Sequence, residues 1–194
     1  MRSGRQPCRV ASRWLRIAVY AVVLWVSAVS ASHAQATPPP SAQVVAEAVM
    51  RARAEGKAVL IEFGASWCTW CRNFEAFVVS ADAGRVLQAH FVIVKLTVHE
   101  RGDKQALEHP GGNALMDTMG GAKAGLPFYV FLDAGGRKVA DSNAMPDGTN
   151  VGFPAVPEEI QAFVGVMGRA APTMSAEDRA ILRGYLTRTM NESR

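Results

Sequence analysis

The sequence predicts an α/β protein in which a mixed central β-sheet carries helices on both faces. Three short, nearly continuous apolar segments, residues 58–63, 91–98 and 127–133, have the length and composition of buried strands. Segments with helical spacing of apolar residues separate them, and a short turn after the third predicts a hairpin. We expect the helix-connected strands to run parallel and the hairpin to add an antiparallel edge strand.

The first half of the chain alternates helix and strand. Ser41 is placed to cap a first helix, which Gly56 is expected to end. The strand at residues 58–63 follows, and the apolar spacing then predicts helices over residues 69–80 and 82–89. The second strand comes next, so the first two strands and their helices form one βαβ unit.

The second half contains two longer irregular segments. Residues 99–124 are polar and contain glycines, and we expect them to hold one helix around residues 113–119. The third strand turns through residues 134–136 into a short strand at residues 137–141. A long loop, residues 142–156, then leads to the C-terminal helices.

Two helices are expected at the C-terminal end. Pro157 is suited to the first position of one of them. The other covers residues 175–194 and opens with Ser175 and Asp178 in the spacing of a capping box.

The N-terminal residues 1–36 have the organisation of a secretory signal peptide. Five arginines and no acidic residue precede an apolar run of 15 residues, 17–31. Small residues then offer cleavage after Ala34 or Ala36. An uncleaved membrane anchor is the competing interpretation, but a span needs roughly 20 apolar residues. The sequence therefore predicts an exported protein that acts outside the cytoplasm, in a bacterial periplasm, with a membrane contact only if the signal stays attached.

The charge of the chain belongs to this leader. The whole sequence has 21 basic and 17 acidic residues and a net charge of +4, but the five leader arginines are part of that excess. Without residues 1–36 the charges nearly balance, with the acids in a slight majority. We therefore expect no nucleic-acid partner.

Two cysteines remain once residues 1–36, which contain Cys8, are removed. Cys68 and Cys71 lie in the sequence WCTWC, directly after a predicted strand. One pair gives no disulfide framework, and a ring closed over such a short loop stabilises a fold by only about 2 kcal/mol. Zinc prefers four ligands at short spacing, which the histidines at positions 90, 99 and 109 do not provide. The remaining interpretation is a disulfide that opens and closes.

A redox pair has a physical basis at this position. The first turn of a helix has unsatisfied N–H groups, and its dipole favours a thiolate. A lowered pKa would make Cys68 the nucleophile that attacks a partner disulfide, and Cys71, one turn further, would then resolve the mixed disulfide.

In combination, these features resemble the thioredoxin superfamily. The residues that carry the resemblance are WCTWC at a helix start, Glu62 six residues before Cys68, and Leu126–Pro127 at the start of a hairpin. The resemblance covers residues 41–170 and implies a thioredoxin-like mixed central sheet. Residues 37–40 would then be a lead-in, and residues 171–194 an extra helical extension at the C-terminus.

The resemblance also implies roles for individual residues. Glu62 would be a buried acid that exchanges the proton of Cys71, although the family more often has aspartate there. An ordinary solvated or ion-paired glutamate is the alternative. Leu126–Pro127 would be a cis-proline dipeptide beside the cysteines, at which the backbone of Leu126 pairs with an extended substrate; a trans proline opening an edge strand is the alternative.

Two tryptophans flank the cysteines. We expect Trp67 to pack beside the site as a hydrophobic shield and Trp70 to offer a contact for a substrate protein. Arg72 either supports the Cys68 thiolate or is a solvated helix residue.

The sequence therefore predicts an exported thiol–disulfide oxidoreductase that needs no cofactor or metal. Its partners would be cysteine-containing proteins and an unidentified redox partner. CTWC lacks the histidine of the strong oxidants, which slightly favours reductase or interchange duty. Two alternatives stay open: a copper-handling protein that uses both thiolates and His99 or His109, and a binding module with incidental cysteines.

Overall fold

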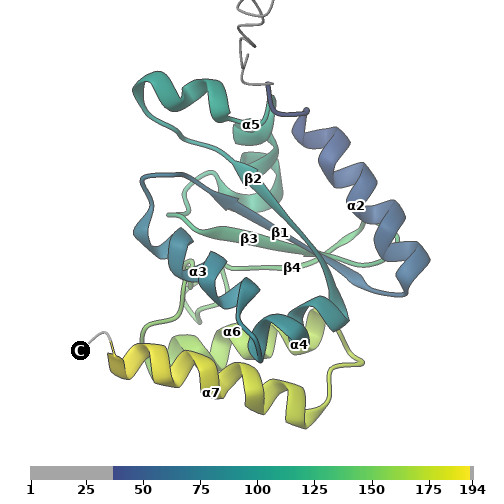
Figure 1. The fold of residues 1–194 in the computed structure, drawn as a ribbon, viewed down its shortest axis with the longest axis vertical. Coiled ribbons are helices and arrows are strands. Elements are labelled where there is room, and N and C mark those ends of the chain that lie inside the picture. The colour runs from purple at the N-terminus through teal and green to yellow at the C-terminus, as the bar shows by residue number, and fades with distance from the viewer. Residues whose placement is uncertain (1–36, 193–194) are drawn as a thin grey trace, which may run out of the picture. The chain divides into compact units, whose positions relative to one another are not determined.

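The computed structural model describes residues 37–192, so the predicted signal peptide lies outside the described residues. The described elements, in chain order, are α2 (Ser41–Glu55), β1 (Ala58–Gly64), α3 (Thr69–Val79), α4 (Ala83–His90), β2 (Phe91–Thr97), η2 (Gly102–Leu107), α5 (Gly112–Met116), η3 (Asp117–Gly121), β3 (Phe128–Leu132), β4 (Lys138–Asp141), α6 (Pro157–Ala170) and α7 (Ala176–Glu192). The predicted α/β class is confirmed (Figure 1).

The strands form one four-stranded mixed sheet in the order β2-β1-β3-β4. β1 and β2 are parallel, as predicted for strands joined through helices. β4 is the antiparallel edge strand that the hairpin predicted. The prediction is wrong for β3, which runs antiparallel to β1 although a helical segment precedes it.

The connection from β2 to β3 explains this orientation. Thr97, at the end of β2, pairs with Gly64, and Phe128, at the start of β3, pairs with the adjacent Phe63. The connection therefore leaves β2 and enters β3 at the same end of the sheet, the end where β1 finishes. α5 has five residues and spans roughly 8 Å, whereas a strand of seven residues spans roughly 23 Å, so this helix cannot make a parallel crossover.

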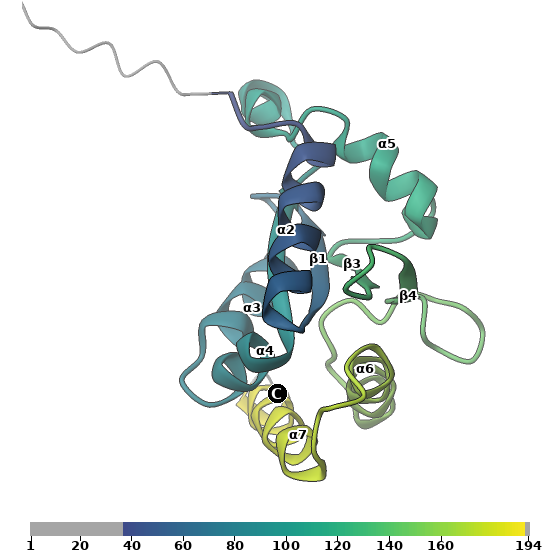
Figure 2. The same cartoon turned by 90° about the vertical axis from the view of Figure 1, so that its right-hand side faces the viewer.

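Alternate residues of each central strand enter two separate cores. Leu60, Tyr129 and Phe131 pack with α3, α4, α6 and α7 on one side. Ile61 and Val130 pack with α2 and α5 on the other side. The predicted arrangement of helices on both faces is therefore confirmed, and Figure 2 shows α6 and α7 adjacent in one layer. Within residues 37–192 no helix is long and apolar enough to cross a membrane.

The helix ends agree with the sequence in three of four cases. Pro157 is the first residue of α6, as predicted. Gly56 ends α2 in the left-handed conformation, with φ 66°. Ser175 and Asp178 form the capping box, because the Ser175 Oγ accepts from the Asp178 N–H at 3.0 Å and the Asp178 carboxylate accepts from the Ser175 N–H at 2.9 Å. Ser41, in contrast, is buried inside the first turn and makes no capping bond, because the helix starts one residue earlier than predicted, after Pro40.

Candidate active site

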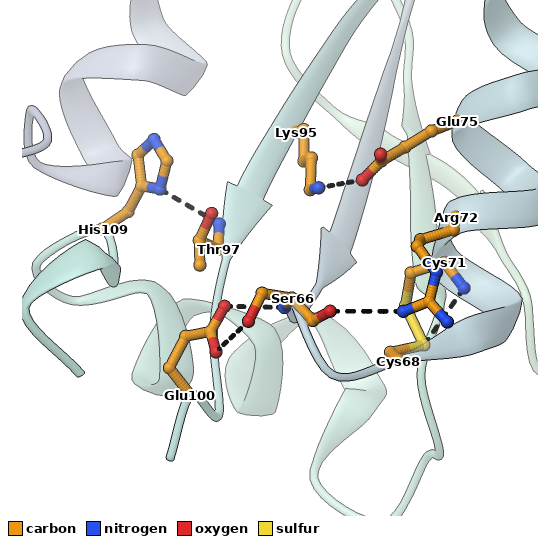
Figure 3. Close-up of polar contacts among 9 residues, drawn as sticks. All are labelled: Ser66, Cys68, Cys71, Arg72, Glu75, Lys95, Thr97, Glu100 and His109. Atoms are coloured by element: carbon orange, nitrogen blue, oxygen red, sulfur yellow. Dashed lines mark hydrogen bonds and ion pairs between the residues drawn. A yellow bond between two sulfur atoms is a disulfide. The ribbon is translucent and has the colours of Figure 1, made fainter. Parts of the chain in front are cut away.

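Cys68 and Cys71 form a disulfide at the start of α3, just beyond the end of β1 (Figure 3). Cys68 is the N-cap residue, in extended conformation, and its Sγ accepts a hydrogen bond from the Cys71 N–H at 3.1 Å. This bond uses one of the helix N–H groups that have no partner inside the helix. Cys71 is completely buried and Cys68 is 4% exposed, so the pair is shielded except at one edge of Cys68.

Two exposed tryptophans lie next to this disulfide. The side chain of Trp67 donates from Nε1 to the carbonyl of His99 at 2.8 Å, and the guanidinium of Arg101 lies 4.0 Å from its ring centroid. Trp70 stacks on Phe153, with ring centroids 6.5 Å apart. Because Trp67 is 41% and Trp70 47% exposed, both rings present apolar surface to solvent beside the cysteines.

Glu62 lies on the α3 side of β1 and is 3% exposed, so the prediction of a buried acid is confirmed. Its Oε1 has no hydrogen-bond partner. Burial raises the pKa of the carboxyl to about 8, with a smaller contribution from Glu75, against a lowering effect of Lys95. A carboxyl that stays protonated near neutral pH can both donate and accept a proton there.

Gly64 brings this carboxyl close to the buried sulfur. A Cβ built on Gly64 would meet the Oε1 of Glu62 at 3.0 Å and the Sγ of Cys71 at 3.3 Å. Both atoms therefore border the same small space, which a larger residue would fill. A side chain at position 64 would therefore crowd both the carboxyl and the sulfur.

A second buried carboxylate, which the sequence analysis missed, holds the loop before Cys68. Glu100 is 5% exposed, and its two oxygens accept from the Ser66 N–H at 2.6 Å and the Ser66 Oγ at 2.9 Å (Figure 3). Arg72 binds the same loop, because its guanidinium donates to the carbonyl of Ser66 at 3.3 Å and to the Oγ1 of Thr69 at 3.0 Å. In this disulfide form Arg72 thus braces the loop.

The Leu126–Pro127 peptide bond is cis, as the resemblance implied. Leu126 packs against the cluster formed by Ala65 and the two cysteines, so this segment lies beside the disulfide. Asn150, from the long loop after β4, donates from Nδ2 to the carbonyls of Gly125 at 2.7 Å and of Pro127 at 3.1 Å. This second residue missed from the sequence braces the segment on both sides of Leu126.

The two histidines considered for copper have other contacts. The N–H of Thr97 donates to Nδ1 of His109 at 3.0 Å, and burial lowers the pKa of this imidazole. His99 has a positive φ of 51°, and its N–H donates to Asn113 at 3.1 Å. In the described part of the chain, no three side chains of His, Cys, Asp or Glu are grouped as a metal site would require.

The chain is similar to known redox proteins. Residues 41–134 match a family described as thioredoxin-like. The thiol:disulfide interchange protein DsbD of Tatumella citrea is 30% identical over 117 residues, which are 59% of this chain and 18% of that protein. A disulphide isomerase from Xylella fastidiosa Temecula1 is 19% identical with a TM-score of 0.46, over 81% of this chain and 93% of that chain. A thioredoxin from Thermus thermophilus is 24% identical with a TM-score of 0.38, over 53% of this chain and 71% of that chain.

Proposed function

The chain belongs to the thioredoxin superfamily, and we propose that it exchanges disulfides with cysteine-containing proteins through Cys68 and Cys71. The observation that carries this proposal is the disulfide at the start of α3, which has exposed apolar rings on one side and a buried carboxyl on the other. The match to an interchange protein supports the same activity, although that relative is much longer than this chain.

The exchange would proceed through a mixed disulfide. In the reduced protein the Cys68 thiolate attacks one sulfur of a partner disulfide, and the other partner sulfur leaves as a thiolate and takes up a proton. Cys71 then loses its proton and attacks the Sγ of Cys68, which releases the second partner sulfur. The released sulfur then takes up a proton as well. The partner thus gains two electrons from the Cys68–Cys71 pair and two protons, one from Cys71 and one from solvent, to which Cys68 gave its own proton when it became a thiolate. The same steps in reverse would oxidise a partner.

Glu62 would serve as the acid and base for Cys71. Because Cys71 is completely buried, its proton needs an acceptor inside the protein. The carboxyl of Glu62 borders the same space beside Gly64. In the forward direction Glu62 would accept this proton, and when the protein's own disulfide opens it would return a proton to the leaving sulfur.

Substrate proteins would bind over the exposed edge of Cys68. Trp67 and Trp70 would supply apolar contact area, and large aromatic side chains of this kind dominate many interfaces. The backbone of Leu126, next to Pro127, would pair with an extended segment of the substrate. The contact of Leu126 with the cysteine cluster supports this placement.

We further propose that the protein acts outside the cytoplasm, in a periplasm, as a reductase or interchange protein supplied by a redox partner. The signal-like residues 1–36 and the missing histidine between the cysteines support this assignment. Sequencing the N-terminus of the exported protein tests the first part, since the expected cleavage follows Ala34 or Ala36.

Two single substitutions test the exchange itself. With dithiothreitol as electron donor and insulin as the disulfide-containing probe, the wild type should reduce insulin faster than dithiothreitol alone. Cys68→Ser should abolish this acceleration, because the nucleophile is absent. Cys71→Ser should instead accumulate a mixed disulfide through Cys68, visible by mass under non-reducing conditions. A Cys68→Ser variant with the wild-type rate would contradict the proposal.

A further inference from the structure

Glu62 lies next to a lysine, Lys95, with which it forms no ion pair. In the parallel pairing of β1 and β2, Glu62 lies opposite Lys95. Neighbouring strands are about 4.8 Å apart, so a lysine at this position can reach a carboxylate on the adjacent strand. A buried carboxyl gains most from such a partner, because an unpaired buried charge is costly. Nevertheless the Oε1 of Glu62 has no hydrogen-bond partner.

Lys95 is paired with Glu75 instead. The Nζ of Lys95 contacts the Oε1 of Glu75, which lies on α3, and Figure 3 shows the two side chains pointing toward one another. Both side chains are about 40% exposed, so this pair forms in contact with solvent. Glu75 therefore competes with Glu62 for the same ammonium group.

The three residues line one cavity of about 530 Å³. α2 and the turn after it contribute Arg51, Glu55 and Lys57 to the lining of this cavity. Glu55 forms an ion pair with Arg51 and another with Lys57. Both of these cations are therefore already engaged by the one carboxylate of Glu55. β3 pairs with β1 on the edge opposite β2, and there the residue next to Glu62 is Tyr129, whose buried hydroxyl has no hydrogen-bond partner. Lys95 is thus the cation that the backbone places opposite Glu62, and the cavity gives it room to move.

We propose that Glu75 is a positioning residue, which holds the Lys95 ammonium away from Glu62 so that Glu62 keeps its proton in the disulfide form. Burial raises the pKa of Glu62, and Lys95 in its present position offsets only part of that rise. If Lys95 turned toward β1 instead, it would stabilise the Glu62 carboxylate, and the proton needed by the sulfur of Cys71 would be lost to solvent. The catalytic use of this arrangement rests on the proposed function, but the arrangement itself does not.

The test is a titration of Glu62 in the oxidised protein. Glutamate labelled with ¹³C at the side-chain carboxyl is incorporated, the Glu62 signal is assigned with Glu62→Gln, and its chemical shift is followed against pH. The wild-type midpoint should lie near pH 8. In Glu75→Gln the midpoint should fall by about one pH unit or more, a tenfold or larger rise in the acid dissociation constant.

A double-variant cycle separates positioning from simple charge removal. Glu75 also repels the Glu62 carboxylate directly. If Glu75 acts mainly through Lys95, then Glu75→Gln should shift the midpoint much less in a Lys95→Met background than in the wild type. Glu55→Gln, a matched change in the same cavity, should leave the midpoint in place. An unchanged midpoint in Glu75→Gln, or equal shifts with and without Lys95, would overturn the inference.

This measurement is independent of redox activity, because no thiol titrates in the disulfide form. If the insulin assay failed and the titration succeeded, the proposed function would be wrong and the role of Glu75 would stand. The opposite pair of results would leave the exchange activity in place and remove the role of Glu75.

Discussion

Two buried carboxylates lie on either side of the cysteine loop, and they differ in their hydrogen bonds. Glu62 is 3% exposed and Glu100 is 5% exposed. Both oxygens of Glu100 accept bonds from Ser66. One oxygen of Glu62 has no partner, and the lysine opposite it on β2 is held by another acid. The two carboxyl groups are thus buried to a similar degree, but only that of Glu100 has hydrogen-bond donors on both oxygens.

The difference indicates a division of labour around the disulfide. A buried carboxylate whose two oxygens both accept hydrogen bonds orders the backbone that it binds. A buried carboxyl without donors costs stability whenever it ionises, so it tends to keep its proton. Glu100 thus braces the loop before Cys68, and the lack of donors to Glu62 supports the proton-transferring role that we propose for it.

The largest expected effect is the contribution of Glu62 to the pH dependence of the free energy of unfolding. Its pKa is about 8 in the folded protein, against an ordinary value of 4.5. Between these values the folded state binds the proton and the unfolded state does not, so the free energy of unfolding falls as pH rises, by up to about 1.4 kcal/mol per pH unit. Below about pH 4.5 both states are protonated and this loss is absent, and above about pH 8 the loss levels off.

Urea unfolding of the wild type and of Glu62→Gln between pH 5 and pH 8 measures this effect. Because the glutamine cannot ionise, the free energy of unfolding of the variant should increase relative to that of the wild type as pH rises. Parallel curves for the two proteins would show that Glu62 is not the unpaired acid described here.

The next effect concerns the rate of exchange. Glu62→Gln should slow the attack of Cys71 on the mixed disulfide by about 100-fold, because the amide cannot take up the proton of the thiol. Rapid-mixing kinetics of insulin reduction at pH 7 would measure the slowing. Glu55→Gln is the matched control and should keep the wild-type rate, whereas equal rates for all three proteins would remove the catalytic role of Glu62.

A smaller effect is expected from removing the other carboxylate. Glu100→Ala should lower the free energy of unfolding by about 2 kcal/mol, because the N–H and hydroxyl of Ser66 lose the acceptor that orders their loop. Glu100→Gln keeps one acceptor oxygen and should lose less. Urea denaturation at one pH decides the point, and a stability as high as that of the wild type would refute the structural role.

The smallest effect comes from the partner of Glu100. Ser66→Ala removes one of the two bonds and keeps the backbone N–H donor, so we expect a loss of about 1 kcal/mol. In a Glu100→Ala background the same change should cost clearly less, since the shared bond is already gone. Additive losses in the double variant would mean that the two residues act separately.

The sequence predicted those parts of the molecule that depend on local patterns. The helix end at Gly56 and the capping box at Ser175 depend on neighbouring residues, so the sequence could predict their positions. Glu62 was predicted to be buried because it interrupts an apolar strand. The WCTWC motif located the cysteines at a helix start for the same reason, since strand and helix periodicity meet there.

The parts that sequence analysis missed depend on contacts between distant residues. Glu100 binds Ser66 across 34 positions and Lys95 binds Glu75 across 20, and no local pattern marks either pair. The orientation of β3 depends on where its connection returns, which the length of α5 decides. Lone polar residues beside apolar strands were the available signal, but they did not identify their partners.

The central claim is that Cys68 and Cys71 are a reversible redox pair. Purified protein is equilibrated in dithiothreitol or glutathione buffers, and the fraction of free thiols is counted after alkylation. We predict a two-electron transition in which both thiols appear together, at a potential nearer about −270 mV than about −120 mV. A potential near the upper value would make the protein an oxidant, against the proposed direction. A disulfide that stays closed, or thiols that stay free, across this whole range would contradict the exchange function itself.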